Sequence, residues 1–303
     1  MTACSNRVSL VESVLPAGLS GSGIGAHIRD GWLQLSAPLR RDRIGRTADL
    51  WPLLGRNAHV SGPTRLALAP GRRSPQLRAD LWIEDGEDEE IASRVVSLCE
   101  DIRQCARAFP GSTALESQRP PGPGPRPSTD AGRVVELCAE AGWPCATRAT
   151  GDAVATIDAG AASYTARFEP GAHDALGIVV DVFEAGAYSP DSRAAAALLL
   201  LAVSSTVRLV KGVARQRGGG ETGAMVAWCP GPVSAPAVDR ALASLAVACE
   251  IAGREALALG DLSTARAYLA WQGWEAVSSP AVADAASDRQ SVAAGYAPAP
   301  LFG

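Results

Sequence analysis

Apolar residues recur at helical spacing in two long segments, one in each half of the chain. In the first half, six of them follow one another at alternating steps of four and three residues: Ile91, Val95, Leu98, Ile102, Cys105 and Phe109. In the second half, six residues repeat these steps: Val238, Leu242, Leu245, Cys249, Ala252 and Ala256. Such spacing places every member on one side of an α-helix. We therefore expect an amphipathic helix in each half, and the two are displaced by 147 residues, as Leu98 and Leu245 show.

Shorter patterns in the first half predict the order helix, two strands, helix, two strands, helix. The stretch HIRDGWLQLSAPL reads as a tight hairpin, because Asp30-Gly31 is a favoured hairpin turn. Thr47 can cap the second helix, with Leu50, Leu53 and Leu54 facing inward. The remaining elements are expected at residues 8–15 (helix), 48–59 (helix), 64–69 and 77–84 (strands).

The second half predicts a helix, three strands, a long helix, strand material and two further helices. Ser189 followed by Pro190 is a strong helix start, since serine caps and proline suits the first helical position. The Gly218–Gly220 stretch reads as a flexible hairpin tip. The expected ranges are 131–141 (helix), 153–158, 163–168 and 176–184 (strands), 191–215 (helix), 223–229 (strand), and a last helix at 261–271.

A proline-rich stretch separates the halves. RPPGPGPRPSTD, at residues 119–130, holds five prolines and two glycines, which exclude a regular helix or central strand. We expect an α+β protein of two related domains, each an antiparallel sheet packed against helices. The domains are expected at 1–112, which is the less complete, and 131–277, with a linker at 113–130 and a flexible tail at 278–303. Matching helix patterns and element order suggest a degenerate internal repeat.

Composition narrows the function classes. The 303-residue chain is 47% hydrophobic and carries a formal net charge of −4, which argues against a nucleic-acid binder that neutralises phosphates. Of its 28 basic residues only Lys211 is a lysine, which we attribute to compositional bias. The longest apolar run, 194–203, falls short of the ~20 residues of a membrane-spanning helix. The start of the chain lacks the pattern of a signal peptide, so we expect a cytoplasmic protein that binds neither membrane nor nucleic acid.

No catalytic, cofactor-binding or metal-ligating set stands out. The seven cysteines form no CxxC pair, so buried free thiols are expected. His27, His59 and His173 fall on different expected elements, and the Gly21-x-Gly23-x-Gly25 run is followed by a strand rather than the helix of a dinucleotide-binding loop. No GxSxG motif is present.

Tryptophans are the residues most suggestive of binding. Trp271 and Trp274 flank a glycine after the last helix, where they either cover the edge of the second core or anchor a protein partner. Trp82 and Trp228 lie on the strand ahead of each amphipathic helix. Together with Trp32 they are either core residues or part of an exposed sheet face that binds a peptide. The candidate partner-binding residues are therefore Trp271, Trp274, Trp228 and Trp82.

The second-half order of a helix, three strands, a long apolar helix, strand material and an amphipathic helix is similar to the fold of type III secretion chaperones and the related YbjN-like proteins. The resemblance covers about residues 20–110 and 131–260, and the first half lacks one strand of the plan. It implies compact α+β domains that pair as dimers and bind an extended protein segment. A tandem repeat could supply that pair within one chain, as a monomeric pseudo-dimer, although a homodimer is also open.

Three hypotheses about function follow. The leading one is a non-enzymatic protein-binding module, chaperone-like or an adaptor, without a cofactor. The second is an enzyme of unknown class whose site lies in the cleft between the domains. The third is a scaffold protein that uses the tail at 278–303 as a tether.

Overall fold

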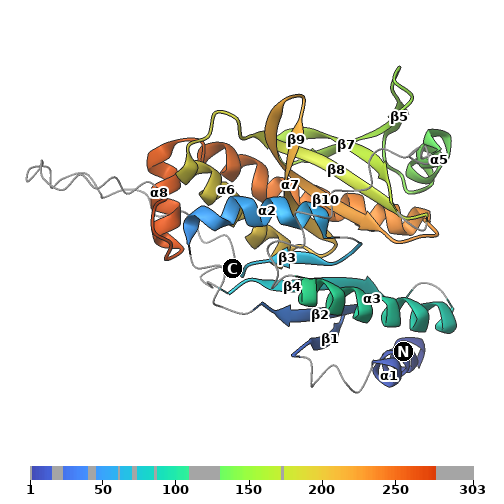
Figure 1. Cartoon of the computed structure of the whole chain (residues 1–303). Coiled ribbons are helices and arrows are strands. Elements are labelled where there is room, and N and C mark those ends of the chain that lie inside the picture. The colour runs from blue at the N-terminus through green and yellow to red at the C-terminus, as the bar shows by residue number, and fades with distance from the viewer. Residues whose placement is uncertain are drawn as a thin grey trace, which may run out of the picture.

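Two antiparallel sheets, one of four strands and one of six, are packed with helices in the computed structural model (Figure 1). The predicted α+β class is thereby confirmed. The structure describes residues 2–15, 23–39, 46–60, 62–69, 74–84, 87–108, 130–171 and 174–277. The expected linker, apart from Asp130, and the expected tail lie outside these ranges.

The first half contains the predicted order of helices and strands. Its elements are α1 (Thr2–Val14), β1 (Gly25–Arg29), β2 (Trp32–Pro38), a 3-10 turn (Thr47–Asp49), α2 (Leu50–His59), β3 (Arg65–Ala67), β4 (Gln76–Trp82) and α3 (Asp88–Ala108). Asp30 and Gly31 have φ values of 51° and 75°, as the two-residue hairpin turn requires. Leu50, Leu53 and Leu54 are buried as expected.

The second half adds more strands. Its elements are α5 (Ala131–Glu140), β5 (Cys145–Thr147), β6 (Ala153–Ala159), β7 (Ala162–Pro170), β8 (Leu176–Glu184), α6 (Pro190–Thr206), β9 (Val210–Arg217), β10 (Gly220–Cys229), α7 (Ala235–Ala258) and α8 (Leu262–Trp271). The Ser189 cap is confirmed, because its Oγ accepts a hydrogen bond from the Ser192 N–H at 3.0 Å. Gly218 and Gly219 form the β9–β10 hairpin turn, with φ values of 58° and 88°.

These elements differ from the prediction in several places: α1 begins at Thr2 rather than at residue 8, β5 was not expected, and β10 begins at Gly220 rather than at residue 223. The helix expected at 191–215 ends at Thr206, and β9 begins four residues later. Serine, threonine and valine residues at 204–207 weaken the helix, and Leu209 turns the chain with a φ of 63°. Thr47 does not cap α2, because its hydroxyl donates to the Glu275 carbonyl instead.

The two sheets share an order of strands. The first runs β1-β2-β4-β3, and the second runs β5-β6-β7-β8-β10-β9. The last four strands of the second sheet thus follow the order of the first. In each set a helix, α2 or α6, joins the second strand to the third, and a longer helix, α3 or α7, follows the fourth.

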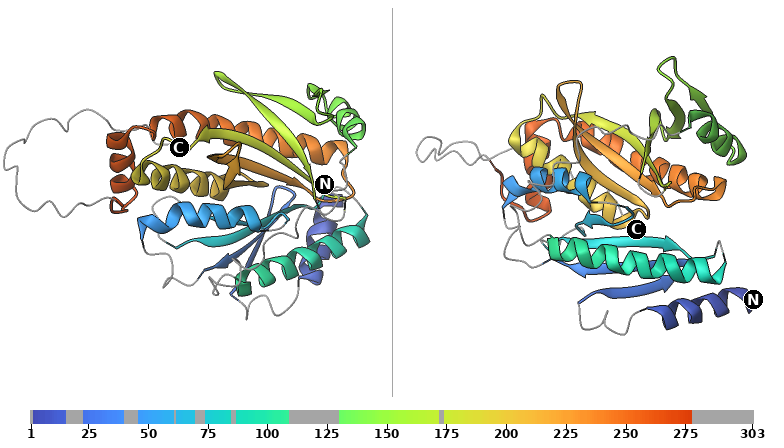
Figure 2. Two further views of the ribbon diagram at one scale, coloured as in Figure 1. Left: turned by 45° about the horizontal axis from the view of Figure 1, so that its top comes forward. Right: turned by 45° about the vertical axis from the view of Figure 1, so that its right-hand side comes forward.

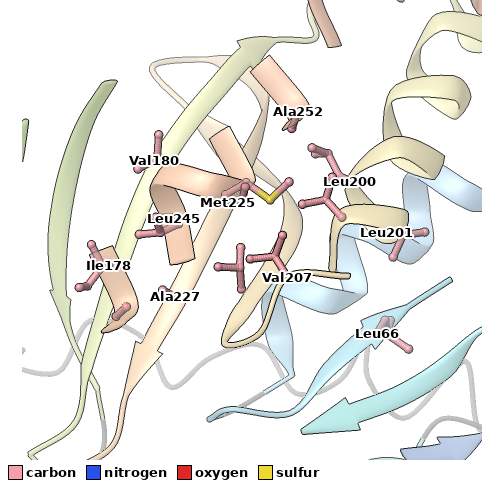
Figure 3. Close-up of a cluster of buried hydrophobic side chains, with 14 of the residues drawn as sticks. Leu66, Ile178, Val180, Leu200, Leu201, Val207, Met225, Ala227, Leu245 and Ala252 are labelled. Atoms are coloured by element: carbon pink, nitrogen blue, oxygen red, sulfur yellow. The ribbon is translucent and has the colours of Figure 1, made fainter. Parts of the chain in front are cut away.

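A single apolar cluster runs through both halves. It includes Leu66 on β3, Leu201 on α6 and Met225 on β10 (Figure 3). Helix α6 is buried along nearly its whole length, because it contacts β3 as well as its own sheet. The division of the chain into two domains stays a prediction, while the described residues place the halves against each other.

Helix α2 packs on β9 of the other half, and α6 packs on β3. A helix from each half thus covers the edge strand of the other half (Figure 2). Asn57 of α2 is fully buried and accepts from the Leu66 N–H at 2.8 Å. Its Nδ2 donates to the Gly212 carbonyl of β9, also at 2.8 Å. On the other side, Ser204 Oγ of α6 accepts from the Gly212 N–H at 2.7 Å. Gly212 permits this approach, because an added Cβ would lie 2.6 Å from Leu200 Cβ.

Two buried basic residues reach across the same interface in opposite directions. Arg65 of β3 donates from Nε to the Ser204 carbonyl near the end of α6, at 2.7 Å. Lys211 of β9 donates from Nζ to the carbonyl of Val60, which ends α2, at 2.5 Å. A cation is favourable there, because helix C-termini carry partial negative charge. We call these interactions, with those of Asn57, the exchange contacts.

Leu245 of α7 tests whether the stripe predicted from the sequence is core. It is fully buried beside Ile178 and Val180 of β8 (Figure 3). Leu245→Ala should lower the free energy of unfolding by about 2–5 kcal/mol, because it leaves a cavity. Val247→Ala, on the same helix but 49% exposed, should change it by less than about 0.5 kcal/mol. Urea unfolding measures both; a cost below about 1 kcal/mol for Leu245→Ala would contradict this assignment.

Candidate functional site

A cavity of about 1000 Å³ lies between the two halves. The first half lines it with the end of β4, one side of α3 and the turn between α2 and β3. The second half contributes β9, the end of β10, and the start of α7. Its volume is at the upper end of the ~300–1,000 Å³ common among ligand-binding sites. One of the exchange contacts, from Lys211 to the Val60 carbonyl, lies in its wall.

Two of the tryptophans flagged by the sequence meet in this cavity. Trp82 of β4 and Trp228 of β10 both line it, and Trp32 of β2 joins them. Trp32 and Trp82 pack edge to face, with ring centroids 5.1 Å apart. The Arg240 guanidinium of α7 lies 5.3 Å from the centre of the Trp82 ring, a cation–π contact between the halves. Apolar rings from both sheets therefore face one space.

Trp228 is held flat on its own sheet by glycine. A Cβ added at Gly171 would lie 2.5 Å from Trp228 Cη2, and one added at Gly177 would lie 3.9 Å from its Cε3. Gly177 is the direct cross-strand partner of Trp228. Gly171 therefore leaves room for the indole ring, whereas a Cβ at Gly177 would make an ordinary contact, and the ring stays half-buried along the cavity wall.

Lys211, the only lysine of the chain, also lines the cavity. It is 7% exposed, and burial lowers the pKa of its ammonium group to about 8. The Cys105 thiol acts in the opposite direction, while the Arg215 and Arg65 guanidinium groups lower the pKa further. At pH 7 the group is therefore mostly protonated and buried. Sequence reasoning dismissed this residue as compositional bias, although its being the one lysine among many arginines was a usable signal.

Most other charged groups around the cavity are paired. Carboxylates meet guanidinium groups at 2.6–2.7 Å in three pairs: Arg65–Asp80, Arg94–Glu90 and Arg215–Glu169. Burial raises the pKa of the Asp101 carboxyl, with the neighbouring Glu100 adding to the shift. Burial likewise raises the pKa of Cys105 to about 11, so that thiol is neutral at pH 7. Within the described residues, Lys211 forms no ion pair with any of these carboxylates, and its charge is left uncompensated by them.

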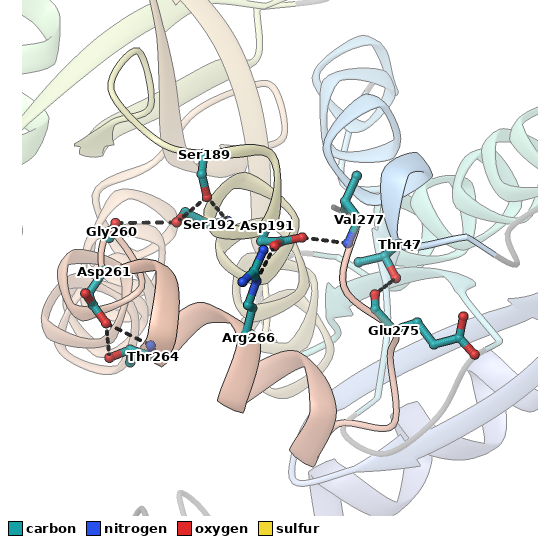
Figure 4. Close-up of polar contacts among 10 residues, drawn as sticks. All are labelled: Thr47, Ser189, Asp191, Ser192, Gly260, Asp261, Thr264, Arg266, Glu275 and Val277. Atoms are coloured by element: carbon teal, nitrogen blue, oxygen red, sulfur yellow. Dashed lines mark hydrogen bonds and ion pairs between the residues drawn. The ribbon is translucent and has the colours of Figure 1, made fainter. Parts of the chain in front are cut away.

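Trp271 and Trp274 lie at the far end of the second half. Trp274 is 5% exposed within the apolar cluster, whereas Trp271 is 57% exposed beside Tyr268. The segment after them is tied down by Asp191, which accepts from the Val277 N–H at 2.5 Å and from Arg266 Nε at 2.8 Å (Figure 4). Binding of a partner by Trp271 stays a prediction.

The remaining candidates of the sequence fall into ordinary places. His27 and His59 are exposed, Gly25 begins β1, and His173 and Gly21 lie outside the described ranges. Four cysteines are buried free thiols, as expected: Cys99, Cys138, Cys229 and Cys249. Within the described ranges, no cluster of three or more potential metal ligands forms, and no helix there combines the length and apolarity needed to cross a bilayer.

Comparisons of the chain with protein-family models, with curated proteins and with solved structures found no match.

Stability as a function of pH tests the state of Lys211. Its pKa lies below that of an unfolded lysine, so the unfolded chain binds the proton more tightly. The folded protein is therefore destabilised by the buried charge of Lys211 below pH 8, and this destabilisation decreases as the pH rises toward about 10.5. Relative to Lys211→Met, the wild type should gain about 2–3 kcal/mol of stability between pH 7 and pH 10, measured by urea unfolding.

Lys211→Met also leaves the Val60 carbonyl without its donor. That cost is the same at every pH, so it cancels when the stabilities at the two pH values are compared. Arg217→Gln is the matched control on the same strand, because a guanidinium does not titrate in this range and Arg217 does not contribute to the pKa of Lys211. A constant stability difference between the wild type and Lys211→Met at all pH values would contradict the lowered pKa of Lys211.

Proposed function

We propose that this protein is a non-enzymatic, cytoplasmic protein-binding module, chaperone-like or an adaptor. In this proposal its halves form a tandem pseudo-dimer that holds an extended segment of a partner protein between them. The observation that carries it is the reciprocity of the exchange contacts. Helix α2 packs on β9 while α6 packs on β3, which is the pattern of a two-fold interface in which the same patch is used twice.

The positions of the contacting residues support the pseudo-dimer. Asn57 and Ser204 each accept from a backbone N–H of the following strand, and they are 147 residues apart. Arg65 and Lys211 each donate to a carbonyl near the end of the opposite helix, and they are 146 residues apart. The amphipathic helices show nearly the same displacement. The shared strand order also favours a repeat, and with it the resemblance to type III secretion chaperones.

The cavity is the place in which a partner segment would bind. Trp82 and Trp228 stand 146 residues apart and line it from the two sheets. Tryptophan is enriched among the residues that dominate binding energy at protein interfaces, because it buries a large rigid surface. Half-exposed rings on both walls offer such a surface to an extended peptide.

An enzymatic role is the second candidate, since Lys211 and Asp101 line the same cavity with shifted pKa values. Perturbed groups in a cavity are one mark of an active site. Against it, Asp80, Glu90 and Glu169 are engaged by arginines.

Selection of displayed random twelve-residue peptides on the purified protein tests the protein-binding role. Peptides should be enriched, and Trp228→Ala should weaken the best of them by about tenfold or more in fluorescence anisotropy, as expected for a hot-spot residue. Trp271→Ala, whose ring lies away from the cavity, is the matched control and should change the affinity by less than about twofold. Thermal unfolding of each variant checks that the fold is kept.

Absence of enriched peptides would contradict the proposal and favour the enzymatic role. Loss of binding in Trp271→Ala rather than Trp228→Ala would move the binding site to the end of α8.

A further inference from the structure

The strand next to Lys211 offers it no counter-ion. In the sheet register, Lys211 of β9 stands directly opposite Val226 of β10. The diagonal neighbours on that face of β10 are Ala224 and Trp228, two positions to either side. All three side chains are uncharged. A carboxylate at any of these three positions would stabilise the Lys211 ammonium group, but β10 has none there.

Arg65, the corresponding residue of the first half, has a different neighbour. Its guanidinium lies 2.6 Å from Asp80 on the adjacent β4, and both side chains are almost fully buried. Asp80 and Val226 are 146 residues apart, the same separation as Arg65 and Lys211. The first half therefore neutralises its buried cation with its own carboxylate, and the second half has valine at the matching place in the sequence.

Groups from the other packed elements do not replace that carboxylate. The Cys105 thiol of α3 is neutral at pH 7, and Arg215 on β9 and Arg65 on β3 add positive charge. The Asp101 carboxyl, also on α3, lines the same cavity and interacts with Cys105, but it forms no ion pair with Lys211, and burial raises its pKa. No carboxylate among the described residues lies within 4.0 Å of Lys211 Nζ, whose one hydrogen-bond acceptor there is the Val60 carbonyl. An ammonium group has three protons to donate. Among the described residues, Lys211 therefore has N–H donors without an acceptor and a charge without a counter-ion beside the cavity.

We propose that the partner segment held in this cavity presents an acidic side chain, whose carboxylate pairs with Lys211 between Trp82 and Trp228. This inference rests on the protein-binding role proposed above and specifies the chemistry of the segment. A buried charge is tolerated when it is paired and hydrogen-bonded. The carboxylate of the bound segment would take the part that Asp80 plays for Arg65.

Val226 provides a test that does not remove the lysine. Val226→Asp places a carboxylate directly opposite Lys211, even closer in register than Asp80 is to Arg65, because Arg65 stands opposite Arg78 and Asp80 lies two residues further along β4. It should occupy the ammonium group and repel an acidic peptide. Val226→Asn, which has nearly the same shape and no charge, is the matched control.

The probes are two sets of synthetic twelve-residue peptides built from serine, alanine, valine and tryptophan. One set carries a central glutamate and the other a central glutamine. Measured by fluorescence anisotropy, the glutamate set should bind the wild type about tenfold or more tightly than the glutamine set, as a charge-assisted hydrogen bond would give. Lys211→Met should bring that ratio close to one. Val226→Asp should weaken the glutamate peptides about tenfold or more, and Val226→Asn should leave them within about threefold.

The outcomes separate the two proposals. Equal binding of both peptide sets to the wild type would overturn the acidic-side-chain inference and leave the protein-binding role standing. Binding of neither set, together with no enrichment in the random selection, would remove the protein-binding role and the inference with it. Binding of the small carboxylate 3-phenylpropionate without binding of any peptide would also overturn the inference, because the carboxylate would then come from a small molecule.

Discussion

The exchange of helices between the two halves is the constraint on which the rest of this structure depends. Helix ends leave backbone carbonyls without partners, and an edge strand leaves a row of unpaired groups. Here α2 and α6 are laid on each other's edge strands, and buried side chains complete the hydrogen bonds. Asn57 alone satisfies three backbone groups, those of Leu66 N–H, Leu66 C=O and Gly212 C=O. Leaving one such group unpaired costs about 1–3 kcal/mol, so the arrangement is strongly specified.

The cavity and its chemistry follow from that exchange. Because β3 and β9 lie next to each other, the ends of the sheets face one space, and their tryptophans line it together. The same exchange buries Arg65 and Lys211 at the helix ends. Only Arg65 has a carboxylate at hand, so the asymmetry between two otherwise matching positions is the feature that points to a ligand. The proposed protein-binding role and the proposed acidic segment both grow from this one interface.

Local patterns predicted most of the fold. Features that depend only on neighbours in sequence could be predicted. They are the steps of four and three residues in α3 and α7, the Asp30-Gly31 turn and the Ser189-Pro190 helix start. The end of α6 could not be predicted, because no glycine or proline interrupts the chain before Gly212, and β9 forms only once it has a sheet to join. Thr47 was misjudged for a similar reason, since its hydroxyl is claimed by the distant Glu275 carbonyl.

The candidate site was predictable only in part. Trp82 and Trp228 were flagged, since tryptophan is rare and conspicuous, but their meeting in one cavity depends on docking of the halves. Lys211 carried one signal in the sequence, as the only lysine among many arginines, but its burial and the lack of a carboxylate within 4.0 Å exist only in three dimensions. Asn57 carried no signal, since a polar residue within an amphipathic helix is ordinarily exposed.

Cleavage of the chain between the halves tests the central claim most directly. A protease site introduced within residues 113–129 would allow the intact, folded protein to be cut there, followed by size-exclusion chromatography and native mass spectrometry. If the exchange contacts hold the halves together, the two fragments will stay in a one-to-one complex without the connecting chain. Separation of the fragments into two independently folded species would contradict the account.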